Sequence, residues 1–226
     1  LAAHYRVHLG TFIDREEDRV HEGTLDAFCE SKLTVTLDAR TARLRSVAGF
    51  VTGEALTLPY YRSAELRRWI EHTITAHSIR KAVVYSGAMA QYVRDLGLHV
   101  VLDFVDVDSA KWTQYAERHA WPTSYVYRRE GEKLLSFERS AAAGSAASVF
   151  VTRSEAELFL RAAPEFRSRV HVIENGVDSE YFCPDPQRAS PFRRGEAAIV
   201  FTGAMDYWPN IDAATWFARE VLPAVI

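Results

Sequence analysis

The sequence has little cysteine, no long apolar run and no excess of positive charge, and each shortage argues against a class of protein. Its two cysteines, Cys29 and Cys183, lie far apart and form no CxxC or CxxH motif. A reducing compartment therefore fits better than a disulfide framework or a cysteine-based zinc site. The formal net charge is −3, so the chain lacks the overall positive charge with which proteins bind nucleic acid without sequence preference. We therefore expect no nucleic-acid partner.

Sequence patterns that would direct the chain across a membrane are also missing. The most apolar stretch, 140–151, is interrupted by serines and is too short to span a bilayer. No signal-peptide pattern is recognisable. The chain begins with Leu1, just before a strand-like run, and stops inside a helical pattern. We therefore expect it to be a piece of a longer cytoplasmic protein.

The sequence does contain enough apolar residues for a core, in a regular alternation of two patterns. Hydrophobic residues make up 48% and charged residues 25%, which is normal for a globular protein. Short apolar runs alternate with segments of helical period, and this predicts an α/β protein with a Rossmann-like parallel sheet flanked by helices. The predicted strands are 4–13, 33–37, 81–85, 98–105, 148–152, 169–173 and 197–202.

Local signals predict helices between these strands. Early acidic residues and a late lysine predict a helix over 14–32, and a leading serine with a one-sided apolar pattern predicts another over 63–77. Ser154 and Glu157 fit a capping box at the start of a further helix. Gly97 is expected to end the helix before it, because glycine adopts positive φ readily.

Ligands in parallel α/β sheets bind beyond the carboxyl ends of the strands, so the residues after each predicted strand are candidates for a site. Asp106 follows strand 98–105, and its carboxylate could accept a proton from a hydroxyl or bind a sugar hydroxyl. We expect it to be the catalytic group. Asp108 could bind substrate, although capping of the following helix is the simpler interpretation. Asp103 lies within the strand, and its role is open.

Two other strand ends offer candidates for binding. Ser86 and Gly87 open a helix whose free N–H groups could bind an anion or a hydroxyl, a pattern that many helices share. Gly203 would let a ligand approach the backbone closely. Trp208 provides either a stacking face for a ligand or an apolar cover for the helix that follows it.

The stretch 39–52 combines an apolar face with basic residues. Its apolar residues are Leu44, Val47, Ala48 and Val51, and the flanking arginines are Arg43 and Arg45. A helix of this kind can lie in the headgroup region of a membrane with its arginines on acidic lipid. It can equally be an ordinary helix docked on the sheet, which is the interpretation that we favour.

Several motifs in order resemble one enzyme family. The run ENGVDSEYFCP (174–184) follows a predicted strand and is similar to the interdomain joint of family 4 glycosyltransferases, which have the GT-B fold of two facing Rossmann-like domains. The ordered set more closely resembles the sugar transferases of PEP-CTERM/exosortase exopolysaccharide loci, from about Arg6 to the last residue. The further motifs are VVLDFVDVDSAKW (100–112), YRREGEKLLSFERS (127–140) and FTGAMDYWPN (201–210).

The resemblance implies two domains of the GT-B type. Residues 1–178 would be the acceptor-side domain without its first strand, 179–196 the linker, and 197–226 the first strand and helix of the donor-side domain. The NGVD motif is then a domain joint rather than a surface hairpin. The candidate substrate-binding residues are Ser86, Gly87, Asp108, Asn175, Asp178, Gly203, Ala204, Trp208 and Asn210.

The resemblance also implies a chemistry. Such enzymes transfer a sugar from a nucleotide donor to an acceptor hydroxyl, with retention of configuration and without a metal, so we expect no cofactor. The family holds the departing diphosphate with a basic pair after the strand that matches 197–202. The loop here contains Ala204, Met205, Asp206 and Tyr207. Backbone N–H groups of Gly203 and Ala204 would have to take over that role.

Two functions from different classes are compatible with these patterns, because a fold alone does not determine a function. One is a glycosyltransferase that acts on a saccharide or a lipid-linked saccharide in exopolysaccharide biosynthesis, with peripheral contact to the inner face of the membrane. The other is a non-catalytic α/β module that binds a saccharide or a nucleotide. In the first case we expect these 226 residues to be inactive by themselves.

Overall fold

The chain divides into two compact units, each described here by itself. The computed structural model describes residues 1–185, 187–193, 195–205 and 208–225. Unit 1 is Leu1–Gly176 and unit 2 is Val177–Ile226, so the boundary falls inside the NGVD motif. The predicted linker and the predicted donor-side piece both lie in unit 2, and their roles stay predictions.

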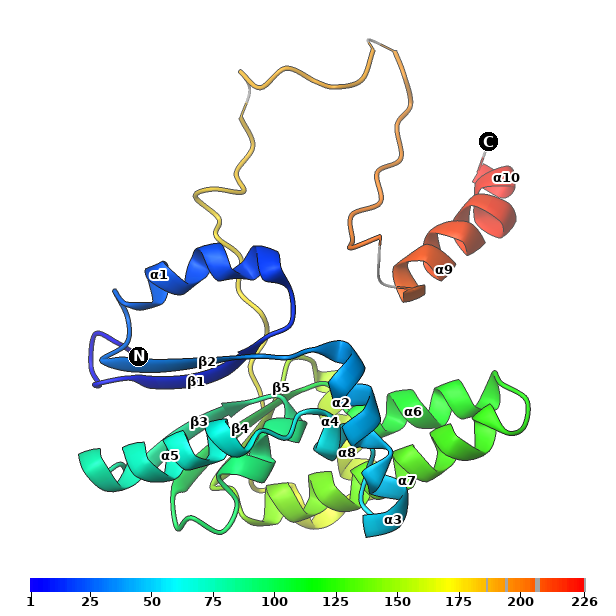
Figure 1. Cartoon of the computed structure of the whole chain (residues 1–226). Coiled ribbons are helices and arrows are strands. Elements are labelled where there is room, and N and C mark those ends of the chain that lie inside the picture. Colours follow the sequence, from blue (N-terminus) through cyan, green and yellow to red (C-terminus); the bar gives the residue numbers. More distant parts are fainter. Residues whose placement is uncertain (186, 194, 206–207, 226) are drawn as a thin grey trace. The chain divides into compact units, whose positions relative to one another are not determined.

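Unit 1 contains two parallel sheets flanked by helices (Figure 1). The smaller sheet pairs β1 with β2, and the larger has the order β3-β4-β5-β6, with each neighbouring pair parallel. The strands are β1 (His8–Ile13), β2 (Ser31–Thr36), β3 (Lys81–Tyr85), β4 (His99–Val105), β5 (Ala147–Phe150) and β6 (Val170–Val172). The predicted α/β class with parallel strands and flanking helices is confirmed.

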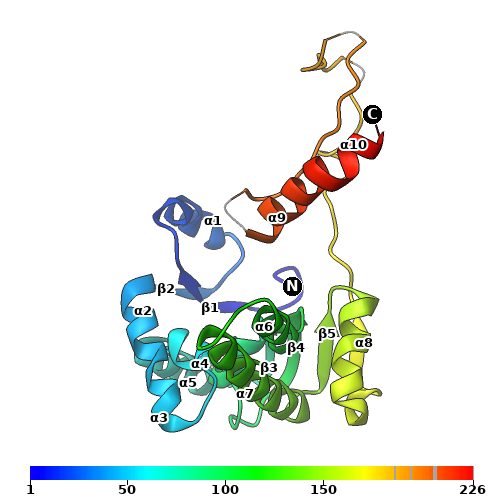
Figure 2. The ribbon, with the colours of Figure 1, turned by 90° about the vertical axis from the view of Figure 1, so that its right-hand side faces the viewer.

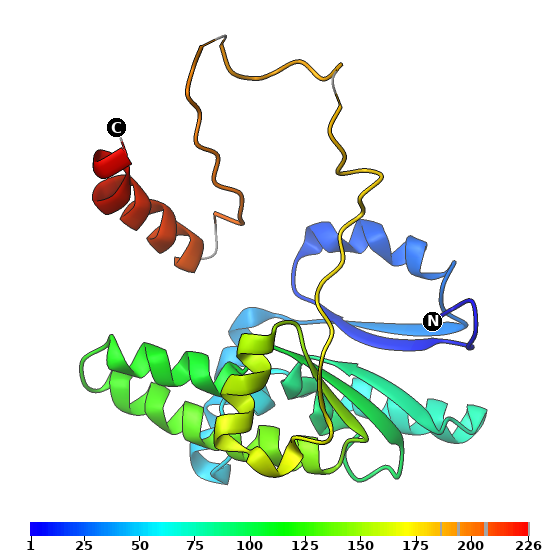
Figure 3. The same ribbon diagram turned by 180° about the vertical axis from the view of Figure 1, so that it is seen from behind.

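Helices connect and cover these strands. α5 packs on β1 and β2, α8 packs on β5 and β6 (Figure 3), and α6 and α7 form a long antiparallel pair. In Figure 2, α2 and α3 lie at one outer edge of unit 1 and α8 lies at the other. The helices are α1 (Glu22–Leu25), α2 (Ala39–Ser46), α3 (Ala48–Thr52), α4 (Thr57–Tyr60), α5 (Ala64–His77), α6 (Asp108–Glu117), α7 (Thr123–Ala143) and α8 (Arg153–Ala162), with 3-10 helices at Glu16–His21, Gly87–Tyr92 and Pro164–Phe166.

The core of unit 1 lies between the larger sheet and its helices. The rings of Phe104 on β4 and Phe150 on β5 stack with their centroids 5.2 Å apart, and Phe159 of α8 lies 5.6 Å and 5.2 Å from them. Leu102 and Phe150 have no exposed surface. Aromatic contacts of this kind stabilise a core beyond their buried area, and they fix the carboxyl end of β4 against its neighbours.

The predicted helix 63–77 is confirmed together with its cap. The Ser63 hydroxyl oxygen accepts a hydrogen bond from the backbone N–H of Leu66 at 3.2 Å, and the helix ends where Ser78 adopts φ 52°. Gly10 of β1 lies directly beneath this helix. A Cβ there would lie 2.8 Å from Leu66 Cδ1, so glycine permits the close packing of α5 on β1.

The expectation of one helix over 14–32 is wrong. A 3-10 helix, Glu16–His21, and the single turn of α1 take its place, and β2 already begins at Ser31. Neither helix has a buried residue. Without an apolar face to pack on the sheet, favourable end charges alone do not support a long helix.

Two smaller expectations about helix ends also need correction. α8 is capped by Thr152, whose hydroxyl oxygen accepts a hydrogen bond from the Glu155 N–H at 3.1 Å, so the motif begins two residues before the predicted Ser154. The segment after β3 is only the 3-10 helix Gly87–Tyr92. Gly97 does adopt positive φ, 67°, but in the turn that precedes β4 rather than at a helix end.

Unit 2 is helical at its end and irregular before it. Its helices are α9 (Trp208–Trp216), a π-helical turn (Phe217–Val221) and α10 (Leu222–Val225). The predicted strand 197–202 is wrong, because these residues pair with no strand in the described part of the chain. Ile199 and Val200 are 60% and 64% exposed. β-branched residues favour a strand only where a neighbouring strand completes the ladder.

Candidate functional site

The backbone is strained at the carboxyl ends of both β3 and β4. Ser86 has φ 72° and Val105 has φ 68°, a region that is costly for a β-branched side chain. The Asp106 N–H donates to the Phe104 carbonyl at 2.8 Å and closes a tight three-residue turn around Val105. Such strain costs roughly 1–3 kcal/mol per residue and is concentrated at functional sites. The turn directs the chain out of the sheet at Asp106.

Asp103 holds this strained turn together, which answers the question of its role. Its Oδ1 accepts a hydrogen bond from the Val105 N–H at 3.0 Å, and its carbonyl accepts one from the Ser86 N–H at 2.8 Å. The pairing of β4 with β5 shifts register between Asp103 and Val105. One residue therefore supports the positive φ angles at both strand ends.

Asp106 and Asp108 share one lysine. Lys111 Nζ lies 2.8 Å from Asp106 Oδ2 and 3.2 Å from Asp108 Oδ1. The side chains of Asp106 and Lys111 are 35% and 37% exposed, so a ligand can reach them. Partial burial alone would lower the pKa of Lys111, but hydrogen bonds and charge from the two aspartates outweigh it and raise that pKa. Two carboxylates and one ammonium leave the group with a net negative charge.

The predicted role of Asp108 as a helix cap is wrong. Asp108 is the first residue of α6, the capping position is Val107, and no side chain of that residue caps the helix. Two distant glutamates accept the free N–H groups instead. Glu155 Oε2 accepts from Val107 N–H at 2.7 Å, and Glu138 Oε1 accepts from Ser109 N–H at 3.0 Å. Asp108 is therefore left to bind Lys111.

Glu138 is a buried acid behind this group. It lies on α7, is 2% exposed, and accepts a second hydrogen bond from the Ser109 hydroxyl at 2.6 Å. Burial raises its pKa to about 7, the hydrogen bonds from Ser109 lower it, Asp108 raises it and Lys111 lowers it. The protonation of Glu138 therefore depends on the charges of the Asp106–Lys111–Asp108 group.

Tyr61 lies beside the same group, at the end of α4. Burial raises the pKa of its phenol, and the charges of Tyr60, Asp14 and Asp108 raise it further. Asp14 directly follows β1, so the end of the smaller sheet also contributes to this edge. The Tyr92 hydroxyl donates to the Tyr61 carbonyl at 2.6 Å and fixes this part of the backbone.

Ser86 and Gly87 have structural roles in this arrangement. Ser86 adopts the strained positive φ at the end of β3. Gly87 is buried, and a Cβ added there would lie 3.0 Å from Phe104 Cδ1. The 3-10 helix that they begin has six residues, which is short for an anion-binding helix end. Binding of a substrate by these two residues stays a prediction.

The other candidate residues lie at the end of unit 1 and in unit 2. Asn175 is exposed at the end of unit 1. Asp178 Oδ1 accepts hydrogen bonds from Glu180 and Tyr181 N–H at 3.1 Å and 3.0 Å, so it closes a local turn. Asp178 therefore uses one carboxylate oxygen for the backbone.

Within unit 2, Asn210 closes the loop that follows residue 202. Its Nδ2 donates to the Ala204 carbonyl at 3.0 Å, and a Cβ at Gly203 would lie 2.8 Å from that nitrogen. A larger residue at 203 would therefore displace the Asn210 side chain from this hydrogen bond. Trp208 begins α9, but its side chain lies outside the described part of the structure, as do Asp206 and Tyr207. Donor binding by this loop stays a prediction.

One group of potential metal ligands comes together among the described residues. One ligand atom from each of His8, Glu30 and His77 lies within 4.8 Å of the others. Two metal ligands on a tetrahedral zinc ion lie only roughly 3.3 Å apart. The Arg6 guanidinium is 3.6 Å from Glu30, and burial followed by the charge of His77 lowers the pKa of His8. Glu30 is therefore shared between Arg6 and this group, in which Glu30 and His77 are exposed.

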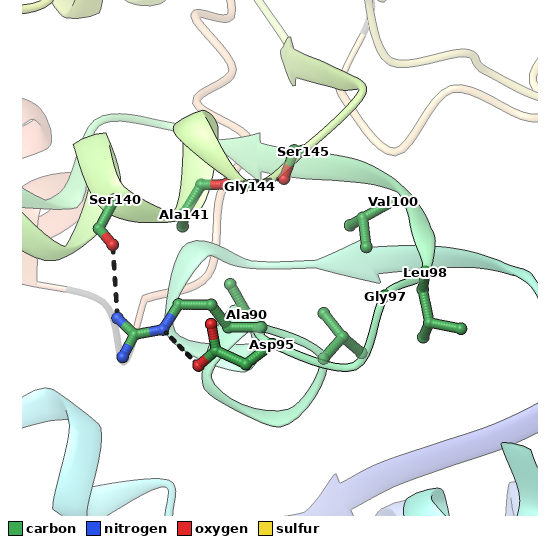
Figure 4. A pocket seen from close by; sticks show the side chains of 11 residues that line it. Ala90, Asp95, Gly97, Leu98, Val100, Ser140, Ala141, Gly144 and Ser145 are labelled. Carbon is green, nitrogen blue, oxygen red and sulfur yellow. Dashed lines mark hydrogen bonds and ion pairs between the residues drawn. The ribbon is translucent and has the colours of Figure 1, made fainter.

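A pocket of about 380 Å³ lies elsewhere, near the amino end of β4 (Figure 4). Val100, at the start of β4, and Ser145, after α7, are among its lining residues. Within the pocket, Arg94 donates to Asp95 and to Ser140, each at 3.4 Å. The polar groups that line the pocket therefore largely pair with one another. Because Asp106 lies at the other end of β4, this pocket is not part of the candidate site.

Lys111, Glu138 and Tyr61 were not identified from the sequence as members of this site. A signal exists for Glu138, since it falls among apolar residues on one face of α7 and is thus an acid where the pattern demands a hydrophobic residue. Among known proteins, no family model and no curated protein matches the chain. Every helix in the described residues is too short or too polar to cross a bilayer.

Proposed function

We propose that the chain belongs to a retaining glycosyltransferase of the GT-B type, which moves a sugar from a nucleotide-sugar donor to a saccharide or lipid-linked saccharide in exopolysaccharide biosynthesis. The observation that carries the proposal is the accessible Asp106–Lys111–Asp108 group on a strained turn at the carboxyl end of β4. Ligands of parallel α/β sheets bind at this edge. The ordered motifs of the sequence support the same function.

The net negative charge of this group favours the acceptor, rather than the donor, as its ligand. Two carboxylates against one ammonium repel a diphosphate but accept hydrogen bonds from sugar hydroxyls. Lys111 occupies one oxygen of Asp106, and the carboxylate is exposed enough to bind an acceptor hydroxyl. In this proposal Asp106 orients that hydroxyl and accepts its proton as the new glycosidic bond forms. The leaving diphosphate is then held by other groups.

Asp106→Asn tests the proposal in the complete gene product. The amide keeps the size of the side chain but loses the negative charge, so turnover should fall by about a hundredfold if Asp106 is an acid–base group. Release of nucleoside diphosphate in the presence of acceptor is the measurement. Asp95→Asn is the matched control, because Asp95 is exposed and lies beside the remote pocket. Parent-level turnover by a folded Asp106→Asn protein would contradict the role.

A non-catalytic module that binds a saccharide or a nucleotide is the second candidate. The described part of unit 2 contains helices and an irregular run but no strand, so it forms no second Rossmann-like sheet. The two functions differ in one result. In the module, Asp106→Asn weakens saccharide binding and no turnover exists to be lost, whereas in the enzyme turnover is lost at saturating acceptor.

A further inference from the structure

α2 and α3 present an exposed apolar surface, and this is unusual for helices of a folded unit. Leu44 is 75% exposed, Val47 57%, Phe50 45% and Val51 90%. We name the surface formed by Arg40, Arg43, Leu44, Val47, Phe50 and Val51 the α2–α3 face. Single exposed hydrophobic residues are common, but four within eight residues of sequence form a cluster that normally marks an interaction site. The docked-helix interpretation of this stretch is therefore wrong for its apolar side.

The two helices act as one continuous support for this face. Val47 ends α2 and precedes α3 with helical angles, φ −58° and ψ −28°, so the helical spacing continues through it. Arg40, Leu44, Val47 and Val51 follow one another at intervals of three or four residues and share a side. Ala42 and Gly49, seven residues apart, are the buried positions on the other side. The apolar residues thus point away from unit 1 together.

The charge around the face is positive. Residues 39–53 contain Arg40, Arg43 and Arg45 and no acidic residue. The acids at the two ends already have partners. Asp38 Oδ1 accepts the Thr41 N–H at 2.9 Å as the cap of α2, and Glu54 pairs with Arg62 at 2.7 Å.

The far end of the face is held in place by a partly buried arginine, Arg129. The Arg129 guanidinium lies 5.0 Å from the ring centroid of Phe50. The same side chain donates to the Gly49 carbonyl at 2.7 Å and to the Glu54 carbonyl at 3.2 Å. α3 is therefore anchored to α7, and Phe50 is presented on a fixed backbone rather than on a loose loop.

We propose that the α2–α3 face binds the surface of an anionic lipid bilayer. Leu44, Val47 and Val51 would enter the boundary between headgroups and acyl chains, while Arg40 and Arg43 would bind lipid phosphates. The positive charge of the α2–α3 face argues against a second copy of the chain as its binding partner. Symmetrical pairing of two such faces would bring the arginines of one copy against those of the other.

Binding at this face would bring the membrane close to the candidate site. α2 follows the carboxyl end of β2, the same edge of the smaller sheet that carries Asp14 at the end of β1. Arg45 donates to the Tyr60 carbonyl at 3.3 Å, and Tyr60 precedes Tyr61. A saccharide on a lipid carrier could then reach the site from the bilayer. This consequence rests on the proposed glycosyl transfer, whereas the binding itself does not.

Co-sedimentation with vesicles tests the binding without any sugar donor. The protein should bind vesicles of phosphatidylcholine mixed with phosphatidylglycerol, and bind pure phosphatidylcholine far less. Leu44→Asn with Val51→Asn should reduce the partition by roughly a hundredfold, since each side chain contributes about tenfold. Arg40→Gln with Arg43→Gln should reduce it by about twenty-fivefold, since each arginine contributes about fivefold. Arg45 is left unchanged because it binds Tyr60.

Matched controls separate this face from general stickiness. Val20→Asn removes another exposed aliphatic side chain, 76% exposed, and Arg68→Gln removes an exposed arginine of α5. Both should bind vesicles as the parent does. Hydrogen exchange should show protection of residues 39–53 on vesicle addition and no change in α8. Loss of binding by the variants with unchanged melting temperature supports the proposal.

Three results would overturn the proposal. The first is equal sedimentation of the parent and the Leu44→Asn, Val51→Asn variant. The second is equal loss of binding in the two control variants, which would mean that no particular face is used. The third is a parent dimer in the absence of lipid that the Leu44→Asn, Val51→Asn variant converts to a monomer, because the face would then be a contact between copies. A failure of vesicle binding leaves the Asp106 assay unaffected, so the two proposals fail separately.

Discussion

Two glutamates in the middle of α7, Glu130 and Glu138, accept hydrogen bonds at the start of another helix, yet their surroundings differ. Glu130 and Glu138 are 1% and 2% exposed, and each accepts backbone N–H groups at the start of another helix. Glu130 binds the start of α4 through three hydrogen bonds, from Leu56 N–H, Thr57 N–H and the Thr57 hydroxyl, at 2.6 Å, 2.9 Å and 2.7 Å. Glu138 binds the start of α6 through two hydrogen bonds, both from Ser109.

The difference lies in what surrounds each carboxylate. Glu130 faces backbone donors on both oxygens, so it serves to position α4 and the tyrosines that follow. Glu138 has one backbone donor and one hydroxyl, and it lies near the charges of Asp108 and Lys111. A hydroxyl can accept as well as donate, whereas a backbone N–H cannot. Glu130 is therefore fixed in its role as an acceptor, whereas Glu138 lies where its protonation can change.

The largest expected effect comes from Glu130→Gln. Whichever way the amide points, its NH2 group meets a backbone N–H of Leu56 or Thr57, and one buried donor loses its acceptor. We expect a loss of about 3 kcal/mol in the free energy of unfolding, measured by urea denaturation. Glu138→Gln is the matched control, because its NH2 group can donate to the Ser109 hydroxyl. Equal losses in the two variants would contradict this difference between the two glutamates.

The next effect is the pH dependence that Glu138 confers. Its pKa is raised to about 7 in the folded state from an ordinary value of 4.5, so its contribution to stability is complete below pH 4.5 and is lost as the pH rises through 7. The loss amounts to about 3 kcal/mol. Glu138→Gln should remove it, so that the variant gains on the parent between pH 5 and pH 8. Parallel stability profiles of the two proteins would show that Glu138 does not titrate in this range.

The smallest effect is that of Asp108→Asn. Because the negative charge of Asp108 raises the pKa of Glu138, its removal should shift the titration of Glu138 to lower pH. The stability itself should change by less than about 1 kcal/mol, since Asp108 makes a partly exposed ion pair and caps no helix. The same pH series of unfolding measurements gives both quantities. If the variant keeps the pH dependence of the parent but loses more stability at every pH, Asp108 acts as the helix cap that the sequence suggested.

Much of the fold of unit 1 follows from local sequence pattern. β3 has the predicted bounds, β4 begins one residue later than predicted, and Ser63 caps α5 as expected. These features depend on period and on neighbouring residues, which a sequence displays directly. The run 197–202 has an equally good strand pattern and forms no strand, because a strand also requires a partner that no local pattern can reveal.

The candidate site was predictable only at its centre. The rule that ligands bind at carboxyl strand ends is enough to single out Asp106. It cannot reveal that Val105 adopts positive φ. Nor can it reveal that the cap expected of Asp108 is replaced by Glu138 and Glu155, which lie 29 and 48 residues from the N–H groups that they accept. These partners meet only through the packing of α7 and α8. Spacing along the chain therefore located the site but did not give its electrostatics.

The division of unit 1 into two sheets has a practical consequence for handling the protein. A single six-stranded sheet would have two open edges, whereas two sheets with no described ladder between β1 and β3 have four. Each edge offers unpaired N–H and C=O groups to a strand from another chain. β3 adds exposed apolar surface at Val83 and Tyr85, 61% and 69% exposed. Self-association during concentration should therefore begin at β3, and a charged residue introduced at Val83 is the simplest way to improve solubility.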